Sequence, residues 1–369
     1  MRLLSLLPLV LVAGCFNPNL DDGVLGCSTA KTCPAGYSCL GDNRCYHSGR
    51  NYDLSVGPFY GTGALGDLTL TGSGILLADP TTGQLKFDLG SEVLPAGQPG
   101  FTKVDQSNGV SVGIWNFRNI TIPRAITVSP SSNSTAILAF AATGTLDLEG
   151  SVVVDALGAR GGAPGVAGNG VTSGANKQGG NAAAVDASAG GGGGGGNGTN
   201  GEKGGGNSGG AGGSIIGTSA TPMTFGGGGG GGGSAKQSDG GVGGNGGGGI
   251  ALLAAHLKIA GAITANGGLG RASPTKPAGI ATGGGGGGAG GSILLSSDDI
   301  TFVGGSSGDG GAGTLMTAVG RAGADGTNSG GTGGAGGLGR ISLFGTVTGS
   351  ASATPQAASN PSPIGNFPE

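Results

Sequence analysis

Glycine is the feature that most limits what this chain can fold into. Most of its 94 glycines lie between Gly158 and Gly339, where short apolar stretches separate them. Glycine this dense either stays disordered or lets backbones pack directly against one another. Only 10% of the residues are charged and 36% are hydrophobic, whereas disordered segments are usually charged and poor in apolar residues. The composition therefore favours a packed structure.

Glycine also recurs at every third position in parts of this region. Gly240, Gly243, Gly246 and Gly249 follow this spacing, as does the series from Gly330 to Gly339. Three residues per turn is the period of the extended polyproline II helix, and the region has too few prolines for collagen. We expect polyglycine-II segments that hydrogen-bond side by side.

The energetic balance of such segments is close. Ordering a residue costs roughly 1–2 kcal/mol, while a backbone hydrogen bond returns about 1 kcal/mol net. We therefore expect the pure glycine runs, which have no side chain to fix their register, to be the loosest. These runs are Gly190–Gly196, Gly226–Gly233 and Gly283–Gly288.

A longer repeat joins apolar positions to a glycine. Ile250 and Leu252 are followed by Leu257, Ile259 and Gly261, and the same spacing returns from Ile293 to Gly304. Weaker copies run over Ala139–Gly150 and Ile216–Gly227, and a partial copy opens at Ile341. We interpret each copy as two short strands joined by a corner of about four residues, with glycine-rich inserts leaving at the corners. Such units must stack to bury their apolar faces, so residues 136–349 predict a β-solenoid.

Residues 50–135 carry a different pattern. Apolar and polar residues alternate, for example in Asp67–Thr71 and Val110–Phe117, and Gly, Pro and Asn interrupt them. Alternation with period two predicts short strands, so this part is interpreted as the strand-rich start of the solenoid. We expect no helix after the leader, and Trp115 is expected in the core. The whole fold is predicted to be all-β.

The first fourteen residues have the features of a secretory leader. Arg2 precedes an apolar stretch from Leu3 to Val12, which is too short to span a bilayer as a mature helix. Val12-Ala13-Gly14-Cys15 resembles the lipobox of bacterial lipoproteins. The resemblance implies removal of residues 1–14 and attachment of lipid to Cys15, and two or more acyl chains give lasting attachment to a membrane. Phe16, in place of Asp, implies the outer membrane. An ordinary signal peptide with an incidental cysteine is the alternative.

Four further cysteines follow at regular spacing: Cys27, Cys33, Cys39 and Cys45. In an exported chain an even set of cysteines predicts two disulfides, for which three pairings exist. Zinc is the alternative, with His47 as the nearby imidazole. The stretch from Cys33 to Cys39 resembles EGF-like and Dickkopf-like cysteine-rich modules. That resemblance implies the pairs Cys27–Cys39 and Cys33–Cys45. We interpret residues 15–49 as the lipidated N-terminus and this cysteine-rich module, whose simplest role is that of a stiff spacer.

The glycine-rich body resembles known surface proteins of bacteria and phages. The stretches Gly261–Gly268 and Gly290–Leu295 are similar to parts of PE-PGRS-type surface proteins and of the polyglycine-II tips of phage tail-fibre adhesins. The resemblance implies a glycine-rich β-solenoid. The anchor, the disulfide module and a body without catalytic motifs lead us to expect a structural or adhesin-like role. The phage tips place aromatic residues on their loops, whereas Phe225 is nearly alone in these inserts.

Motifs for catalysis are few. Gly304–Gly308 matches a nucleophile elbow, but that motif requires a strand, a turn and a following helix. Asp298 and Asp299, predicted at a corner, offer paired carboxylates or, with Asp309, a calcium site, although a solvated turn is the simpler interpretation. His256 is interpreted as a surface turn residue. We expect no metal and no cofactor, and we predict that the protein is not an enzyme.

Charge and the C-terminal residues complete the prediction. A net charge of −3 and a pI near 5.4 give no electrostatic reason to expect nucleic acid as a partner. Residues 350–369 are rich in proline and are expected to form an extended tail. We therefore predict a lipoprotein of the bacterial outer membrane or cell surface. Its expected partners are the membrane, through the lipid anchor, and glycans, matrix or neighbouring cells. A carbohydrate-active β-helix enzyme and a spacer without any ligand are the alternatives.

Overall fold

The structure is a computed structural model, and it describes the chain in separate stretches. These are residues 25–28, 32–39, 45–47, 61–106, 108–131, 136–158, 189–216, 222–233, 239–274, 280–303, 315–354 and 358–359. Cys15, Asp309 and the whole of the predicted elbow at Gly304–Gly308 lie outside these residues. The described part is all-β and contains no helix, as the sequence predicts.

A short hairpin comes first in the described residues. Strands β1 (Tyr37–Cys39) and β2 (Cys45–His47) pair antiparallel, with Cys39 opposite Cys45. The hairpin holds two of the four predicted disulfide cysteines on neighbouring strands.

Two larger sheets form the body. The strands of the eight-stranded sheet, in spatial order, are β18 (Ser352–Thr354), β16 (Leu315–Thr317), β14 (Ala262–Thr264), β12 (Ser151–Val153), β10 (Ile126–Pro130), β4 (Gly74–Ala78), β5 (Leu85–Phe87) and β6 (Glu92–Leu94). The strands of the nine-stranded sheet are β19 (Ala358–Ser359), β17 (Arg340–Gly349), β15 (Ser292–Phe302), β13 (Gly249–Ile259), β11 (Ile137–Leu148), β8 (Ser111–Phe117) and β7 (Phe101–Asp105), with β9 (Asn119–Ile122) beside β11 and β3 (Asp67–Thr69) beside β9.

From β10 onward the chain alternates between the two sheets. Successive strands of one sheet pair parallel and in register, so that Leu146, Leu257 and Ile300 occupy equivalent positions in β11, β13 and β15. Each later strand therefore lies on its predecessor, and the repeated apolar positions of the sequence form continuous stacks.

The core lies between the sheets. Alternating residues of both sheets point inward and are buried, as in β10 and β9. Trp115 is fully buried, as predicted, with its ring centroid 5.3 Å from that of Phe140, and its indole nitrogen donates a hydrogen bond to the carbonyl of Gly83 (2.8 Å). In the first halves of β11, β13 and β15 both faces are buried, because a second apolar cluster that includes Met223 covers the outer side.

Two of the glycines that end a repeat unit, Gly150 and Gly261, lie where the chain passes from one sheet to the other. A Cβ on Gly261 would collide with the carbonyl oxygen of Gly150 one layer earlier, and a Cβ on Gly150 would collide with that of Ile126. Glycine is required there because consecutive layers bring their backbones into direct contact.

The predicted corners were placed wrongly. The four residues between the two apolar pairs of a unit, such as Leu253–His256, continue one long strand instead of turning. Asp298 and Asp299 likewise lie within β15. The pairing of β15 with β17 has an irregular register here, between Ser296 and Asp299. The irregularity allows the strand to continue while the side of the strand that is exposed to solvent changes.

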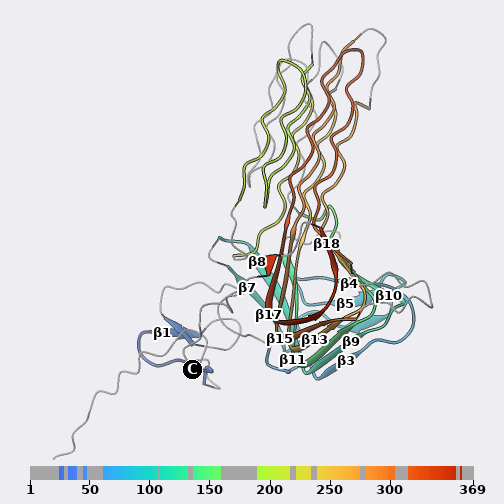
Figure 1. The fold of residues 1–369 in the computed structure, drawn as a ribbon. Coiled ribbons are helices and arrows are strands. Elements are labelled where there is room, and N and C mark those ends of the chain that lie inside the picture. Colours follow the sequence, from blue (N-terminus) through green and yellow to red (C-terminus); the bar gives the residue numbers. More distant parts are fainter. Residues whose placement is uncertain are drawn as a thin grey trace, which may run out of the picture.

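The glycine-rich stretches connect the eight-stranded sheet back to the nine-stranded sheet. We call the following described segments the glycine lattice: residues 189–216, 222–233, 239–248, 265–274, 280–291 and 318–339. Figure 1 shows them side by side in an elongated lobe that extends from the two sheets. The residues from Met223 to Gly227 lie in this lattice and in no strand, so the weak repeat copy predicted at Ile216–Gly227 was wrong.

Hydrogen bonding is complete in the middle of the lattice, from Gly283 to Gly291, which we call the central segment. Three neighbouring segments supply the acceptor carbonyls, and successive backbone N–H groups of the central segment donate to each of the three in turn. The acceptors are Gly233, Gly331, Arg271, Gly230, Gly334, Gly268, Gly227, Gly337 and Ala265. Its carbonyls accept from three other segments, at residues 189–197, 239–248 and 318–327, and near its end from Arg340. Every N–H and every C=O of the central segment is thus paired.

This result reverses the expectation for the pure glycine runs. Gly190–Gly196, Gly226–Gly233 and Gly283–Gly288 are buried, and they contain the most enclosed part of the lattice. A Cβ on any glycine from Gly283 to Gly288 would lie less than 3.0 Å from a neighbouring backbone carbonyl oxygen. The absence of side chains therefore permits close packing on all sides, and that packing fixes the register that the runs themselves do not encode.

The glycine pattern of a segment matches how many of its sides are covered. The central segment is almost all glycine and is enclosed on all sides. In residues 330–339 two of every three positions are glycines that face neighbouring segments. The remaining positions, Thr332, Ala335 and Leu338, are exposed or half-buried. In residues 318–327 only every third position is an inward-facing glycine, and exposed residues such as Arg321 stand between. The period of three in the sequence marks outer segments.

Candidate functional site

The cysteine module has the pairing that the EGF resemblance implies. Disulfides join Cys27 to Cys39 and Cys33 to Cys45, each across 12 positions of sequence. The sulfurs of Cys27, Cys33 and Cys39 lie close enough together to resemble a metal site. Thiolates are the form of cysteine that binds zinc, and sulfurs in disulfides are not thiolates. The disulfide prediction is confirmed, and the zinc alternative is inconsistent with this oxidised arrangement.

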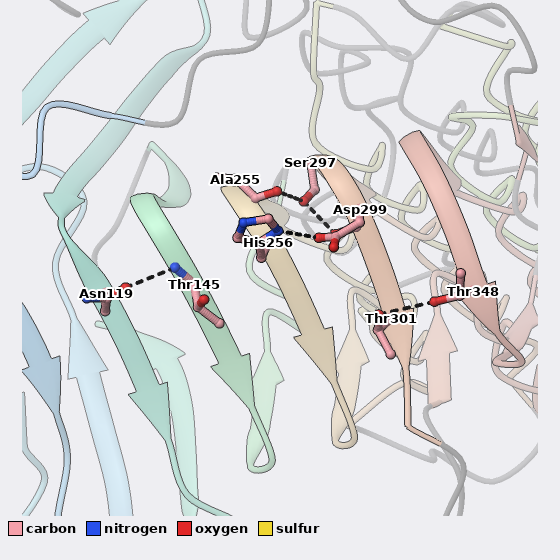
Figure 2. Close-up of polar contacts among 8 residues, drawn as sticks. All are labelled: Asn119, Thr145, Ala255, His256, Ser297, Asp299, Thr301 and Thr348. Carbon is pink, nitrogen blue, oxygen red and sulfur yellow. Dashed lines mark hydrogen bonds and ion pairs between the residues drawn. The ribbon is translucent and has the colours of Figure 1, made fainter.

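The exposed side of the nine-stranded sheet, in the second halves of its strands, carries two rows of polar side chains. We call this surface the polar face. The first row crosses the strands through Asn119, Thr145, His256, Asp299 and Thr346, and the second through Thr69, Thr121, Asp147, Lys258, Thr301 and Thr348. Figure 2 shows members of both rows on successive strands. Neighbouring strands are about 4.8 Å apart, so the face repeats its polar groups at that interval.

Many of these side chains bond along the rows. The imidazole Nδ1 of His256 lies 2.8 Å from a carboxylate oxygen of Asp299, and the ammonium of Lys258 donates to Asp147 over 2.7 Å. Threonine hydroxyls on β15 and β17 are 3.1 Å apart, at Thr301 and Thr348 (Figure 2). The pairs orient the side chains of adjacent layers and present an ordered mixture of donors and acceptors to solvent.

Electrostatics on this face follow from the same bonds. The guanidinium of Arg118 donates two hydrogen bonds to Asp67 (2.9 and 2.8 Å), and Asn119 donates a third (3.0 Å). These bonds lower the pKa of Asp67 to about 2, with the Arg118 hydrogen bond as the largest cause, and the pairing raises the pKa of Arg118. The hydrogen bond with Asp147 likewise raises the pKa of Lys258. Both cations are therefore held in their charged forms.

Serine, histidine and aspartate come together on this face without the geometry of a nucleophilic triad. The hydroxyl of the buried Ser297 lies 2.8 Å from the carbonyl of Ala255 and 2.6 Å from the carbonyl of Asp299 (Figure 2). Its proton is thus directed to main-chain oxygens, whereas a nucleophilic serine must donate a hydrogen bond to the side chain that acts as its general base. This serine holds the irregular part of β15 against β13.

The paired carboxylates that the sequence predicts at a corner lie in a strand instead. Asp298 and Asp299 lie within β15 at its irregular part; Asp298 is exposed, and Asp299 is bound to His256. Asp309 lies outside the described residues. His256 is exposed, as expected, although it stands within β13 and not in a turn.

Sequence reasoning missed the polar face and the buried polar residues at the base of the lattice. The side-chain amide of Asn197, fully buried, donates to the carbonyls of Gly290 (2.7 Å) and Gly291 (3.0 Å). Asn266, 6% exposed, receives Val319 N–H and bonds to Asp155. These side chains satisfy backbone groups where the regular lattice ends. The polar rows could have been found by aligning the repeat copies and comparing their non-apolar positions.

Comparisons with known proteins give no further guide. No protein family, curated protein or solved structure matches this chain. The described residues contain no helix with the length and apolar character needed to cross a membrane.

Proposed function

We infer that this protein is a lipid-anchored structural or adhesin-like protein of the bacterial cell surface, built as a β-solenoid with polyglycine-II inserts. The alternation of β11 to β18 between two sheets, with parallel pairing in each, supports the solenoid. Hydrogen bonds that recur at every third residue of the lattice support the polyglycine-II assignment.

The observation that carries this proposal is the saturated central segment. All of its backbone groups are paired with six surrounding segments, some of them distant in sequence. A lattice of this kind resists bending because displacement of one segment breaks bonds to several others at once. A stiff lobe with little side-chain chemistry suits presentation of a surface at a distance better than it suits catalysis.

The proposed anchor is Cys15, followed by the disulfide module as a spacer. Two disulfides within 19 residues restrict a stretch that is too small for a hydrophobic core of its own. The order along the chain is then membrane, spacer, solenoid and lobe. The polar face is the proposed contact surface for glycans or matrix, because it offers regularly spaced donors and acceptors.

The anchor is tested by fractionation of cells that express the chain with Cys15→Ser. We expect the unchanged protein in the outer-membrane fraction with incorporated palmitate, and the variant released without palmitate. Phe16→Asp serves as a control that keeps the lipid, and it should remain in a membrane fraction. Release of the unchanged protein, or palmitate on the serine variant, would contradict the anchor.

The contact role is tested separately on a glycan array. Lys258→Ala removes a cation from the polar face, and Lys203→Ala removes one from an exposed position of the lattice. We expect the first variant to lose binding at least about fivefold and the second to keep it, because only Lys258 belongs to the polar rows. Absence of any glycan binding would leave the structural role and remove the adhesin-like one.

The enzyme alternative has its own test. Glycan breakdown by the purified protein, abolished by alanine at Asp298, Asp299 or Asp309, would overturn a non-catalytic role. No activity in the unchanged protein on acidic and neutral polysaccharides would support it.

A further inference from the structure

A cavity lies on the outer side of the eight-stranded sheet, beside β4, β5 and β10. Its volume is about 590 Å³, within the range of about 300–1,000 Å³ that is typical of pockets for small ligands. Leu77 of β4, Lys86 of β5 and Ser129 of β10 line it from the sheet, and Leu157, which follows β12, lines it from another side. The polar face belongs to the nine-stranded sheet, so the cavity is a separate surface.

The strand pairing puts three of the lining residues in one row. Leu77 pairs with Lys86 on one side and with Ser129 on the other. The chain neighbours of Leu77, Leu76 and Ala78, are buried in the core, so the row faces outward. Neighbouring strands lie about 4.7–4.9 Å apart. The row therefore brings an ammonium, an apolar side chain and a hydroxyl together on the sheet side of the cavity.

The turn between β4 and β5 borders the cavity through Asp79, and this turn is fixed in place. The carboxylate of Asp79 accepts hydrogen bonds from the N–H of Thr81 and from the hydroxyl of Thr82, each over 2.9 Å. The indole of the buried Trp115 donates to the carbonyl of Gly83, so the turn is also tied to the core. A site that is held in shape before binding loses less conformational entropy when its ligand binds.

The lining has hydrogen-bonding capacity left for a ligand. A carboxylate has about four acceptor sites, and the turn uses two of those on Asp79. Among the described residues, none forms an ion pair with the exposed ammonium of Lys86. The hydroxyls of Ser129 and Ser131 can both donate and accept. The cavity thus offers donors and acceptors around an apolar side chain.

The charges around the cavity favour a neutral ligand. Among the described residues that line it, Asp79 and Lys86 carry opposite charges and the others are uncharged. Glu92 stands opposite Lys86 in the pairing of β5 with β6. A phosphate or carboxylate ligand would therefore meet two carboxylates beside one ammonium, and like charges repel it.

We propose that this cavity binds the neutral sugar at the end of a glycan chain. The hydroxyls of such a ring match the polar groups of Asp79, Lys86 and Ser129, and its C–H groups can pack on the apolar side chains of Leu77 and Leu157. Pockets for small ligands combine apolar walls with a few placed polar groups in this way. The proposal rests on the glycan-contact role proposed above, and it adds a recognition site on the opposite sheet.

The experiment titrates the purified full chain with glucose, galactose, mannose and N-acetylglucosamine, followed by saturation-transfer NMR. We expect at least one of them to bind at millimolar concentration. Ser129→Leu, which removes a hydroxyl and fills part of the cavity, should weaken that binding about tenfold or more. Thr317→Leu makes the same kind of change at a half-buried outward position of β16 and should leave binding unchanged. Circular dichroism checks that both variants keep their strands.

A second comparison separates the cavity from the polar face. Single sugars probe the cavity, because the rows of the polar face are spanned only by an extended chain. Lys86→Ala should weaken the binding of the sugar about fivefold or more, and Lys258→Ala on the other sheet should not. Loss of binding in Lys258→Ala alone would overturn the cavity site and leave the polar face as the glycan contact. Absence of binding by all the sugars, equal weakening by Ser129→Leu and Thr317→Leu, or tighter binding of glucuronic acid than of glucose would also overturn it.

Discussion

Substituting one glycine in the middle of the lattice should destabilise the lobe strongly. Gly287 donates its N–H to Gly334 (2.9 Å) and accepts from Gly195 (2.9 Å), and an added Cβ would lie less than 3.0 Å from the carbonyl oxygen of Arg321. Since non-bonded heavy atoms prefer separations of about 3.5–4.0 Å, Gly287→Ala must push segment 318–327 outward.

The expected cost has two parts. Overpacking of a close-packed site costs about 1–3 kcal/mol. Moving segment 318–327 also weakens two hydrogen bonds, from Arg321 to Gly288 (3.0 Å) and from Ala324 to Gly285 (2.8 Å). At about 1 kcal/mol net for each bond, the sum is about 3–5 kcal/mol. For a domain of this size that corresponds to a melting temperature lower by roughly 10 °C.

Calorimetry of the purified protein measures this change. Ala322→Ser is the matched control, because it also adds one heavy atom, but to an exposed side chain of segment 318–327. Its melting temperature should stay within about 2 °C of the unchanged protein, since exposed substitutions usually fall within about 0.5 kcal/mol. Equal melting temperatures for the two variants would refute the close packing on which the lattice depends.

Three further outcomes are expected. In an NMR titration the Asp67 carboxyl should protonate near pH 2, and Arg118→Gln should return its pKa toward 3.8. Because folding lowers this pKa, the pair stabilises the fold above about pH 4, and the contribution is lost as the pH falls toward 2; an unchanged midpoint in the variant would disprove the pairing. Asn197→Leu should lower the free energy of unfolding by about 1–3 kcal/mol, because the buried carbonyl of Gly290 loses its donor while that of Gly291 keeps the N–H of Arg340, and a thermal melt identical to that of the unchanged protein would contradict this. Replacing Cys33 and Cys45 together by serine should remove about 3 kcal/mol from the small hairpin module, seen as faster amide exchange there, while slow exchange in the variant would show that the second disulfide is dispensable.

Local sequence patterns predicted the strands well and the turns poorly. The apolar alternation around Ile250 and Ile293 marks the inward faces of β13 and β15, and it is set by burial within each strand. The turn was predicted at the wrong place. Leu253–His256 was interpreted as a corner although it contains no glycine or proline, and it continues the strand. The true crossing at Gly261 is determined by contact with Gly150 of the previous layer, which no local window contains.

The order of the glycine lattice could not be predicted from the sequence, for a related reason. Gly192 donates to Gly284 and Gly334 donates to Gly192, and these residues are far apart in the chain. A run of glycines has no pattern of its own, so its register is visible only when its neighbours are known. Among the candidate sites, the disulfide pairing followed from a resemblance, while the polar face required knowing which residues of different repeat copies stand in register.

The interior of the lobe consists of peptide groups, whereas the interior of the two sheets is hydrocarbon. Unfolding the sheets exposes apolar surface and raises the heat capacity, but exposing peptide groups lowers it. The lobe should therefore not lose stability on cooling, while hydrophobic cores weaken in the cold. The central segment, held by its six neighbours, should therefore stay ordered at low temperatures where hydrophobic cores weaken.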